Sequence, residues 1–389
     1  MDAPKLRFPE FSGSWKPAKA GEAFKNNRTR GREGLPIYSV TMDRGMVRRD
    51  SIGREIEADA ADGANLRAQP GDLAYNMMRM WQGAVGRAPE ECMVSPAYVV
   101  LSPKPGVASD FFEHWFRSKR MLYLFRAYSQ GLTSDRLRLY FDDFAQIPLR
   151  IPAPDEQEKI AAFLSALDDR IAQLRARYEW LTKYKKGVVR KLFAQDVRFK
   201  DAAGCEFPDW QESSFGEVAE LRNWKYDPDT SAEALRCVEL EHVSQETGRL
   251  LGYVDSKLQR SVKNRFAAGD VLFGKLRPYL RKYLKAPFDG ACSTEIWVLN
   301  GKKVTNDFLF YLVQSESFMT TAQVSSGSKM PRADWGVVSS GEVAYPCPEE
   351  QAKIAGFLFA LDAQIACAES QLESAKRYKQ GILRNMFIQ

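Results

Sequence analysis

A stretch of 42 residues occurs twice in this chain and constrains the fold more than any other feature. Residues 154–195 return as residues 348–389 without a gap, at an offset of 194 positions. The copies begin PDEQEKIAAFLSALDDRIAQ and PEEQAKIAGFLFALDAQIAC and agree at about half of their positions. Self-similarity at this level predicts one structural unit built twice.

Each copy has apolar residues at the seven-residue spacing of a coiled-coil seam. The predicted core residues are Ile160, Leu164, Leu167, Ile171, Leu174 and Leu181 in the first copy and Ile354, Leu358, Leu361, Ile365, Ala368, Leu372 and Ala375 in the second. Both stretches are therefore predicted to be long helices that need a partner helix. At about 1.5 Å per residue, each helix can reach roughly 60 Å.

Two lysines in the seam indicate the direction of pairing. In a parallel pair in register, Lys185 would lie beside Lys379, two like charges in a half-buried site. An antiparallel pair separates them. It also places Leu174 and Leu181 opposite Ala368 and Ala375, so that large residues face small ones. We predict an antiparallel coiled coil; the alternative is two separate amphipathic helices, each packed on its own domain.

The start of the first helix is marked by helix-boundary residues. Pro152 and Pro154 disfavour a helix before them. Asp155 is predicted to cap the helix, and Glu158 stands three residues further on, as in a capping box.

The segments before the two helices also echo each other. GDLAY at 71–75 and GDVLF at 269–273 stand 198 positions apart, and at the same offset Arg79 meets Arg277. The predicted domains are 1–153, a first globular domain; 154–196, a first long helix; 197–347, a second globular domain; and 348–389, a second long helix. The chain is therefore a globular unit plus helix, repeated once.

Both globular segments are predicted to be β-rich with some helix. Runs of branched and aromatic residues at 97–101, 271–273 and 295–299 lie between Gly, Pro, Asp and Asn residues, as strands do. Helical patches are predicted at 110–128 and 306–319. The fold class is α+β: two β-rich α/β domains in tandem, each followed by a long helix, with an internal pseudo-two-fold repeat.

Sequence signs of catalysis are weak. GDVLFGK at 269–275 begins like a phosphate-binding loop, but Leu276 stands where a hydroxyl is needed for magnesium. GxGxxG and GxSxG motifs are missing. Asp229, Asp255 and Lys257 fit a metal-dependent nuclease only loosely, since such triplets arise by chance. We therefore predict a chain that is not an enzyme.

Composition predicts a cytoplasmic protein without a metal site. The six cysteines form no CxxC pair, and only His114 and His242 could join them, which makes a zinc site improbable on spacing. Residues 1–11 lack the features of a secretory signal, and apolar runs are far shorter than a membrane span.

Clustered cations with interleaved aromatic residues favour nucleic acid as the partner. The net charge of +6 permits this partner without demanding it. The candidate DNA-binding residues are Arg28, Arg30, Arg48, Arg49, Arg79, Thr133 and Ser134 in the first segment and Lys257, Lys263, Lys275, Arg277, Tyr279, Arg281, Lys282, Ser328 and Lys329 in the second. For any single residue, an ordinary solvated surface is the alternative.

With a duplicated PxEQxKIAxFLxALDxxIA helix after each variable β-rich segment, the chain resembles the DNA-specificity subunit of type I restriction-modification enzymes over its whole length. The residues that carry the resemblance are Pro154, Glu156, Gln157, Lys159, Ile160, Ala161, Phe163 and Leu164, matched by Pro348, Glu350, Gln351, Lys353, Ile354, Ala355, Phe357 and Leu358.

The resemblance implies a non-catalytic subunit. Each domain would read one half of a bipartite target in double-stranded DNA, with the helices as a spacer. The implied partners are two methyltransferase subunits and restriction/translocase subunits, and S-adenosylmethionine, ATP and magnesium would bind those partners rather than this chain. A coiled-coil assembly protein without DNA specificity, a regulatory specificity protein without a restriction partner, and a catalytic nuclease or methyltransferase fusion remain as alternatives.

Overall fold

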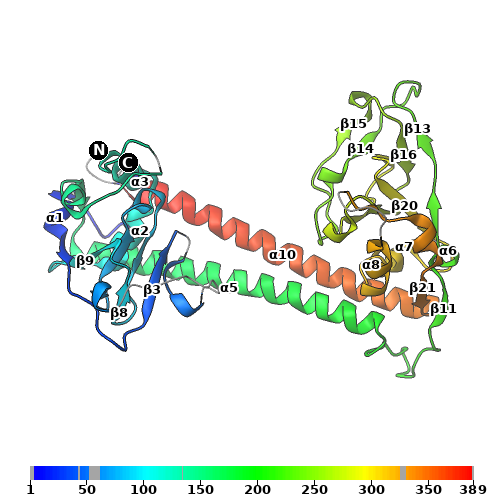
Figure 1. The fold of residues 1–389 in the computed structure, drawn as a ribbon, viewed down its shortest axis with the longest axis horizontal. Helices are drawn as coiled ribbons and strands as arrows, with labels where there is room; N and C mark the ends of the chain where they lie inside the picture. The colour runs from blue at the N-terminus through cyan, green and yellow to red at the C-terminus, as the bar shows by residue number, and fades with distance from the viewer. Residues whose placement is uncertain (1–3, 43, 52–61, 134, 325–329, 388–389) are drawn as a thin grey trace. The chain divides into compact units, whose positions relative to one another are not determined.

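The computed structural model describes residues 4–42, 44–51, 62–133, 135–324 and 330–387. The chain divides into two compact units: unit 1 comprises Met1–Arg175 and Ser370–Gln389, and unit 2 comprises Ala176–Glu369. The long helices α5 (Pro154–Phe193) and α10 (Pro348–Met386) each contribute one part to either unit (Figure 1). Within the described ranges, no helix is both long and apolar enough to cross a membrane.

Unit 1 is a mixed α/β body whose two larger sheets have the strand orders β2-β9-β6-β7 and β4-β3-β8-β5, with β1 paired to β10. Its strands are β1 (Lys16–Lys19), β2 (Phe24–Asn27), β3 (Ile37–Thr41), β4 (Gly45–Arg48), β5 (Leu66–Ala68), β6 (Leu73–Asn76), β7 (Val85–Arg87), β8 (Cys92–Val94), β9 (Tyr98–Pro103) and β10 (Pro148–Ile151). Its helices are α1 (Ala20–Ala23), α2 (Ser109–Phe116), α3 (Lys119–Ala127) and α4 (Phe141–Ala145), with 3-10 turns η1 (Arg49–Ser51), η2 (Asp62–Ala64) and η3 (Met80–Gln82).

Unit 2 repeats this plan, with sheets β12-β20-β17-β18 and β13-β16-β19-β14-β15 and the pair β11-β21. Its strands are β11 (Gln211–Ser214), β12 (Ala219–Arg222), β13 (Lys225–Tyr226), β14 (Arg236–Val238), β15 (Val254–Asp255), β16 (Lys263–Phe266), β17 (Val271–Gly274), β18 (Tyr283–Lys285), β19 (Gly290–Cys292), β20 (Ile296–Gly301) and β21 (Glu342–Tyr345). Its helices are α6 (Phe215–Val218), α7 (Asn306–Leu312), α8 (Glu316–Gln323) and α9 (Trp335–Ser340), with η4 (Leu240–His242), η5 (Ser256–Leu258) and η6 (Pro278–Leu280).

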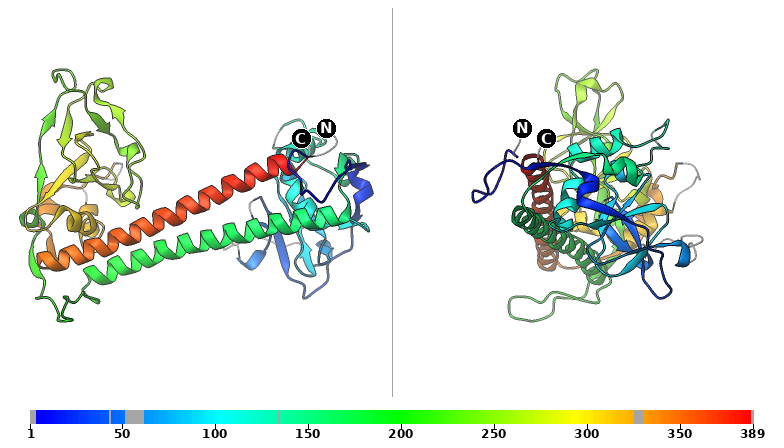
Figure 2. Two further views of the ribbon diagram at one scale, coloured as in Figure 1. Left: turned by 180° about the vertical axis from the view of Figure 1, so that it is seen from behind. Right: turned by 90° about the vertical axis from the view of Figure 1, so that its left-hand side faces the viewer.

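The predicted α+β class and internal repeat are confirmed. Four-stranded sheets of the same order stand at equivalent places in the two units, and all pairs in both sheets are antiparallel. The strands predicted around 97–101, 271–273 and 295–299 are β9, β17 and β20. Figure 2 shows β11 and β21 of unit 2 from behind, beside the first turns of α10.

Each of the two predicted helical patches, 110–128 and 306–319, forms two helices in the structure: α2 and α3 in unit 1, and α7 and α8 in unit 2. Ser118 begins α3 by accepting the Met121 N–H, and Ser315 begins α8 by accepting the Phe318 N–H. A serine that satisfies the first free N–H groups of a helix favours a new start over continuation. The break lets α2 and α7 each pack a buried aromatic face on the four-stranded sheet of its own unit.

The start of α5 is anchored by a buried carboxylate. Glu156 is 1 % exposed, and its Oε1 and Oε2 accept from Arg7 Nε and Nη2, both at 2.7 Å. Trp15 Nε1 donates to the same Oε1 at 3.2 Å. The helix begins at Pro154 with Asp155 inside its first turn, so the predicted cap at Asp155 is wrong. Glu156 instead ties the helix to the N-terminal segment of its unit.

Unit 2 has the same anchor. Glu350 is fully buried and accepts from Arg198 Nη2 at 2.8 Å and from Trp210 Nε1 at 3.1 Å. The segment that carries each arginine is held at an equivalent place. The Leu6 N–H donates to the Asn385 carbonyl in unit 1, and the Val197 N–H donates to the Lys191 carbonyl in unit 2.

The glutamine after each glutamate binds backbone groups of the globular part of its unit. Gln157 Oε1 accepts the Ala108 N–H at 2.9 Å, and its Nε2 donates to the carbonyl oxygens of Gly106 and Pro152 at 3.1 and 2.9 Å. Gln351 makes the matching contacts with Thr305 N–H and with two carbonyl oxygens. The repeated Glu-Gln pair is therefore a joint between helix and domain.

Within each unit, a lysine of one long helix is ion-paired with an aspartate of the other. Lys379 of α10 contacts Asp168 of α5 in unit 1. In unit 2, Lys185 Nζ of α5 lies 2.6 Å from Asp362 Oδ1 of α10. Lysine and aspartate are each 194 positions from their counterparts. In both units an early segment of one helix meets a late segment of the other, in agreement with the antiparallel direction.

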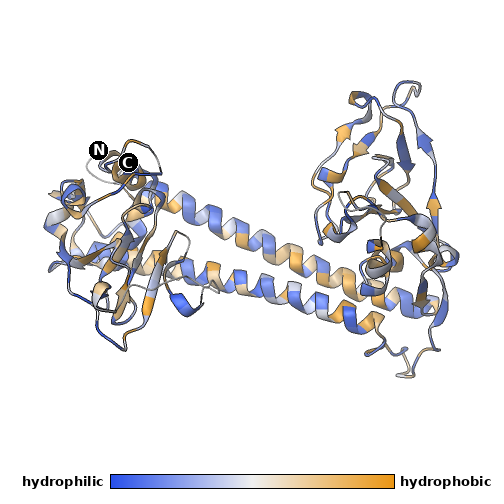
Figure 3. Ribbon diagram, in the orientation of Figure 1, coloured by the Kyte–Doolittle hydropathy of each residue, from blue (hydrophilic) through white to orange (hydrophobic). Residues whose placement is uncertain are grey.

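Most of the predicted seam is shielded from solvent. Nine of the thirteen seam residues are buried, and the remaining four, Leu167, Ile171, Ile365 and Ala375, are half-buried. Apolar and polar residues alternate along both long helices (Figure 3). Knobs-into-holes packing along the whole seam stays a prediction, as do the four domain boundaries.

We predict that Glu156→Ala lowers the free energy of unfolding of unit 1 by about 3 kcal/mol, because it leaves Arg7 and Trp15 without their buried partner. Chemical denaturation followed by tryptophan fluorescence measures the change. Glu158→Ala, an exposed position in the same helical turn, is the matched control and should change stability by less than about 0.5 kcal/mol. Equal effects of the two substitutions would contradict the anchor.

Candidate nucleic-acid interface

The loop between β17 and β18 presents the best-defined cationic surface of unit 2. It carries five predicted DNA-binding residues: Lys275, Arg277, Tyr279, Arg281 and Lys282. Arg277 and Arg281 both have left-handed backbone, with φ of 52° and 47°. The Arg277 N–H donates to the Pro331 carbonyl at 2.8 Å, and the side chain of Tyr279 is about half exposed. A fixed backbone thus presents Arg277 and Tyr279 to solvent, whereas the Arg281 guanidinium is held within the unit, with Nη2 2.7 Å from Glu316 Oε1, and is not part of the exposed surface.

Three predicted DNA-binding cations of unit 2 form ion pairs or hydrogen bonds with groups of their own unit instead. Lys263 is buried, with Nζ 2.6 Å from Glu239 Oε1. Lys257 Nζ donates to backbone carbonyl oxygens of the loop before β14. Lys282 donates to a backbone carbonyl of η4, and burial lowers the pKa of its ammonium group. The structure therefore assigns these three lysines internal partners and places Lys263 on β16 of the five-stranded sheet and Lys257 in η5, which follows β15 of that sheet.

The predicted cations of unit 1 lie in three loops. Arg28 and Arg30 follow β2, Arg48 ends β4, Arg49 begins η1, and Arg79 precedes η3. Arg30 forms an isolated β-bridge with Leu66, and Arg48 Nη2 lies 3.2 Å from Asp50 Oδ2. Arg79 is exposed, and within the described ranges its side chain has a hydrogen bond only inside its own turn, with Nη1 3.3 Å from Gln82 Oε1.

The glycine-containing loops before the long helices contribute less. Ser134, Ser328 and Lys329 lie outside the described residues. The Thr133 carbonyl accepts the Arg136 N–H at 3.0 Å. A hydrogen bond from the Thr133 side chain lowers the pKa of Asp135. Thr133 therefore shapes a turn.

The repeated Gly-Asp pair is structural. Gly71 and Gly269 have φ of 90° and 88°, a conformation that favours glycine. The buried Asp72 accepts the Gln69 N–H at 2.9 Å, and the buried Asp270 lies 2.7 Å from Arg222 Nη1. The pair builds the turn that leads into β6 and β17.

Trp224 is exposed but was not among the residues predicted from the sequence to bind DNA. Trp224 is 50 % exposed in the loop between β12 and β13, and the Arg222 guanidinium stacks on its ring at 4.6 Å from the centroid. The Trp224 carbonyl accepts the Arg265 N–H at 2.7 Å, as the Thr29 carbonyl accepts the Arg67 N–H in unit 1. Aligning the two copies would have found this position, where equivalent backbone carries different exposed side chains.

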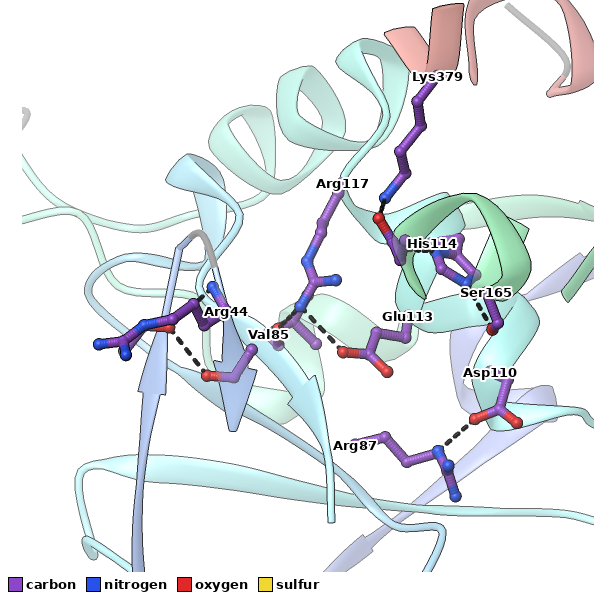
Figure 4. Close-up of polar contacts among 12 residues, drawn as sticks. Arg44, Val85, Arg87, Asp110, Glu113, His114, Arg117, Ser165 and Lys379 are labelled. Carbon is purple, nitrogen blue, oxygen red and sulfur yellow. Dashed lines mark hydrogen bonds and ion pairs between the residues drawn. The ribbon is translucent and has the colours of Figure 1, made fainter. Parts of the chain in front are cut away.

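A buried cluster in unit 1 has the residue types of a hydrolase triad (Figure 4). His114 Nε2 lies 3.2 Å from Ser165 Oγ, and His114 Nδ1 lies 3.5 Å from Asp168 Oδ2, too far for a hydrogen bond. Asp168 is paired with Lys379 instead. Burial, followed by the positive charge of Lys379, lowers the pKa of His114 to about 4, which makes it a poor general base near neutral pH. The cluster packs α2 against the long helices.

Unit 2 also contains a cavity of about 1180 Å³, lined by α5, α10 and the loops around β18. Five of its six lining cations are paired with carboxylates: Lys185 with Asp362, Lys186 with Glu246, Arg249 with Glu369, Arg281 with Glu316 and Lys285 with Asp307. In the described part of the chain, no group of three or more His, Cys, Asp or Glu side chains is placed to hold a metal ion. The exposed loops, rather than this cavity, are the candidate interface.

Comparison with known proteins gives one consistent match. Residues 17–183 and 208–377 match the family model of the type I restriction modification DNA specificity domain. The chain is 25 % identical over 261 residues to the MjaVIII type I restriction enzyme specificity subunit of Methanocaldococcus jannaschii, covering 62 % of this chain and 61 % of that protein. It is 25 % identical over 263 residues to the EcoDI specificity subunit of Escherichia coli, covering 60 % and 59 %. It thus spans about 60 % of these curated relatives.

Solved structures show the same fold. The crystal structure of the type I restriction-modification S subunit from M. genitalium aligns with a TM-score of 0.60 and 15 % identity, covering 100 % of this chain and 99 % of that one. A chain from work on complex assembly and conformational transition of the type I R-M system gives a TM-score of 0.55 and 17 % identity, with coverage of 97 % and 98 %.

We predict that unit 1 loses stability between pH 6.5 and 5 because of His114. Its folded-state pKa is about 4, whereas the unfolded chain takes up the proton near pH 6.5. Acidification therefore favours unfolding, by up to about 3 kcal/mol once both pKa values are passed. Urea denaturation at several pH values measures the loss. His114→Gln should flatten the dependence in this window, and an unchanged slope in that variant would refute the assignment.

Proposed function

Since the chain belongs to the type I restriction-modification DNA specificity family, we propose that it is a non-catalytic subunit that reads a bipartite target in double-stranded DNA. The observation that carries the proposal is the internal repeat. Two units with the same sheet order and the same Glu-Gln joint carry different exposed side chains on equivalent loops. Two units with the same fold but different exposed side chains can bind two half-sites of different base sequence.

Each recognition domain, 1–153 and 197–347, reads one half-site in this proposal. The exposed loops after β2 and β6 and after β12 and β17 supply the contacts with DNA. Specificity arises from side chains that differ between the copies, because base edges carry the sequence and phosphates do not.

The helices 154–196 and 348–389 serve as spacer and docking surface. Trp180 and Tyr184 of α5 stack with ring centroids 5.2 Å apart and are largely exposed, as a protein-binding surface would be. The proposed partners are two methyltransferase subunits that use S-adenosylmethionine, and restriction/translocase subunits that use ATP and magnesium. The proposed location is the cytoplasm.

Co-expression with the neighbouring open reading frames, one of which is expected to encode a methyltransferase, tests the function. We expect adenine methylation at a motif of two short half-sites separated by unspecified bases, read by sequencing that detects modified bases. The control is the same pair with an inactive methyltransferase. Methylation that does not depend on this chain, or a single uninterrupted motif, would contradict the proposal.

Helix length should set the gap between the half-sites. Inserting one heptad into both α5 and α10 adds about 10 Å to each helix, close to three base pairs of duplex. We expect the mapped motif to keep both half-sites and to gain unspecified bases between them. A heptad of altered sequence but unchanged length is the control, and an unchanged gap in the lengthened protein would refute the spacer role.

A further inference from the structure

Arg79 and Arg277 occupy the same place in the two copies of one turn. The turns follow β6 and β17, and their hydrogen bonds match pairwise. The Gln82 and Leu280 N–H groups donate to the carbonyls of Arg79 and Arg277 at 3.0 and 2.9 Å, and the Gly83 and Arg281 N–H groups donate to those of Met80 and Pro278, both at 2.9 Å. The hydrogen-bond pattern of the turn is thus common to both units.

Most side chains of the turn have diverged while this arginine has stayed. The first copy reads Met-Met-Arg-Met-Trp-Gln-Gly at 77–83, and the second reads Lys-Leu-Arg-Pro-Tyr-Leu-Arg at 275–281. Backbone geometry does not explain the retained arginine, because Arg79 has φ of −129° and Arg277 has φ of 52°. A left-handed φ disfavours arginine and would suit glycine.

Contacts inside the units do not explain it either. Both arginines are exposed. Arg79 contacts Gln82 of its own turn, and among the described residues the Arg277 guanidinium has no hydrogen-bond or ion-pair partner. A side chain kept on the left-handed backbone of Arg277, with no partner for its guanidinium among the described residues, points to a role toward a ligand.

Arg281 provides the contrast. It too has left-handed backbone, but its counterpart in the first copy is Gly83, with φ of 91°. Its guanidinium is already engaged, with Nη2 2.7 Å from Glu316 Oε1. Arg281 therefore has an internal partner and is not shared between the units.

We propose that Arg79 and Arg277 are equivalent phosphate contacts that anchor each unit on the DNA backbone. This inference rests on the proposed function. If the two units read different half-sites, the sugar-phosphate backbone is the one part of the DNA that both of them meet in the same form. An arginine that is present in both copies is therefore expected to contact phosphate rather than a base. The diverged neighbours, such as Gln82 and Leu280, are free to differ with the bases.

Selection from a pool of random duplexes by the full chain, alone and with its methyltransferase, tests the inference. The variants are R79A, R277A, R277K and R277G, with R281G as the matched control. We expect R79A and R277A to recover the wild-type motif, with affinity lower by roughly three- to tenfold on cognate and random duplex alike and a salt slope reduced by about one. R277K should restore most of the affinity, because charge suffices for a phosphate.

R277G separates binding from folding. Glycine fits the left-handed backbone, so its melting temperature should not fall while its DNA affinity drops as in R277A. R281G should bind like the wild type. Loss of base preference at one motif position in R277A, without rescue by R277K, would overturn the inference in favour of base reading, and unchanged affinity and salt slope would also overturn it. A wild-type chain that selects no motif would instead overturn the proposed function.

Discussion

A buried glutamate at the start of each long helix is the contact on which the architecture depends. Glu156 and Glu350 are almost fully excluded from water, and each is held by an arginine and a tryptophan indole from the segment that enters its domain. A buried charge is costly unless every partner is in place. Helix, entering segment and domain are therefore fixed together at one point in each unit.

The sequence predicted the elements whose signal is local or repeated. The duplicated stretch led to the two long helices, and the faint echo of GDLAY in GDVLF led to equivalent strands β6 and β17. The antiparallel direction followed from Lys185 and Lys379. Their actual partners, Asp362 and Asp168, were not foreseen, since each lies on the other helix.

The burial and the partners of individual polar side chains could not be predicted from the sequence. Lys263 belongs to a cationic cluster along the chain, yet it is buried against Glu239. Glu156 reads as an ordinary acidic residue in a first helical turn, yet its partner Arg7 is 149 residues away. Such contacts join segments that only the folded sheet brings together. Because several predicted cations have internal partners of this kind, the candidate interface contains fewer residues than the sequence predicted and consists of a few exposed loops.

The contacts of Gln157 and Gln351 affect how freely the sequence of each domain can change. Gln157 and Gln351 recognise the domain only through peptide N–H and carbonyl groups, at Gly106, Ala108 and Pro152 and at Lys303, Thr305 and Pro346. Peptide groups are the same whatever side chains they bear, so these contacts impose no residue identity on the domain side. The side chains of the domain can therefore change without loss of these contacts, provided that its loops return to the same points on the helix.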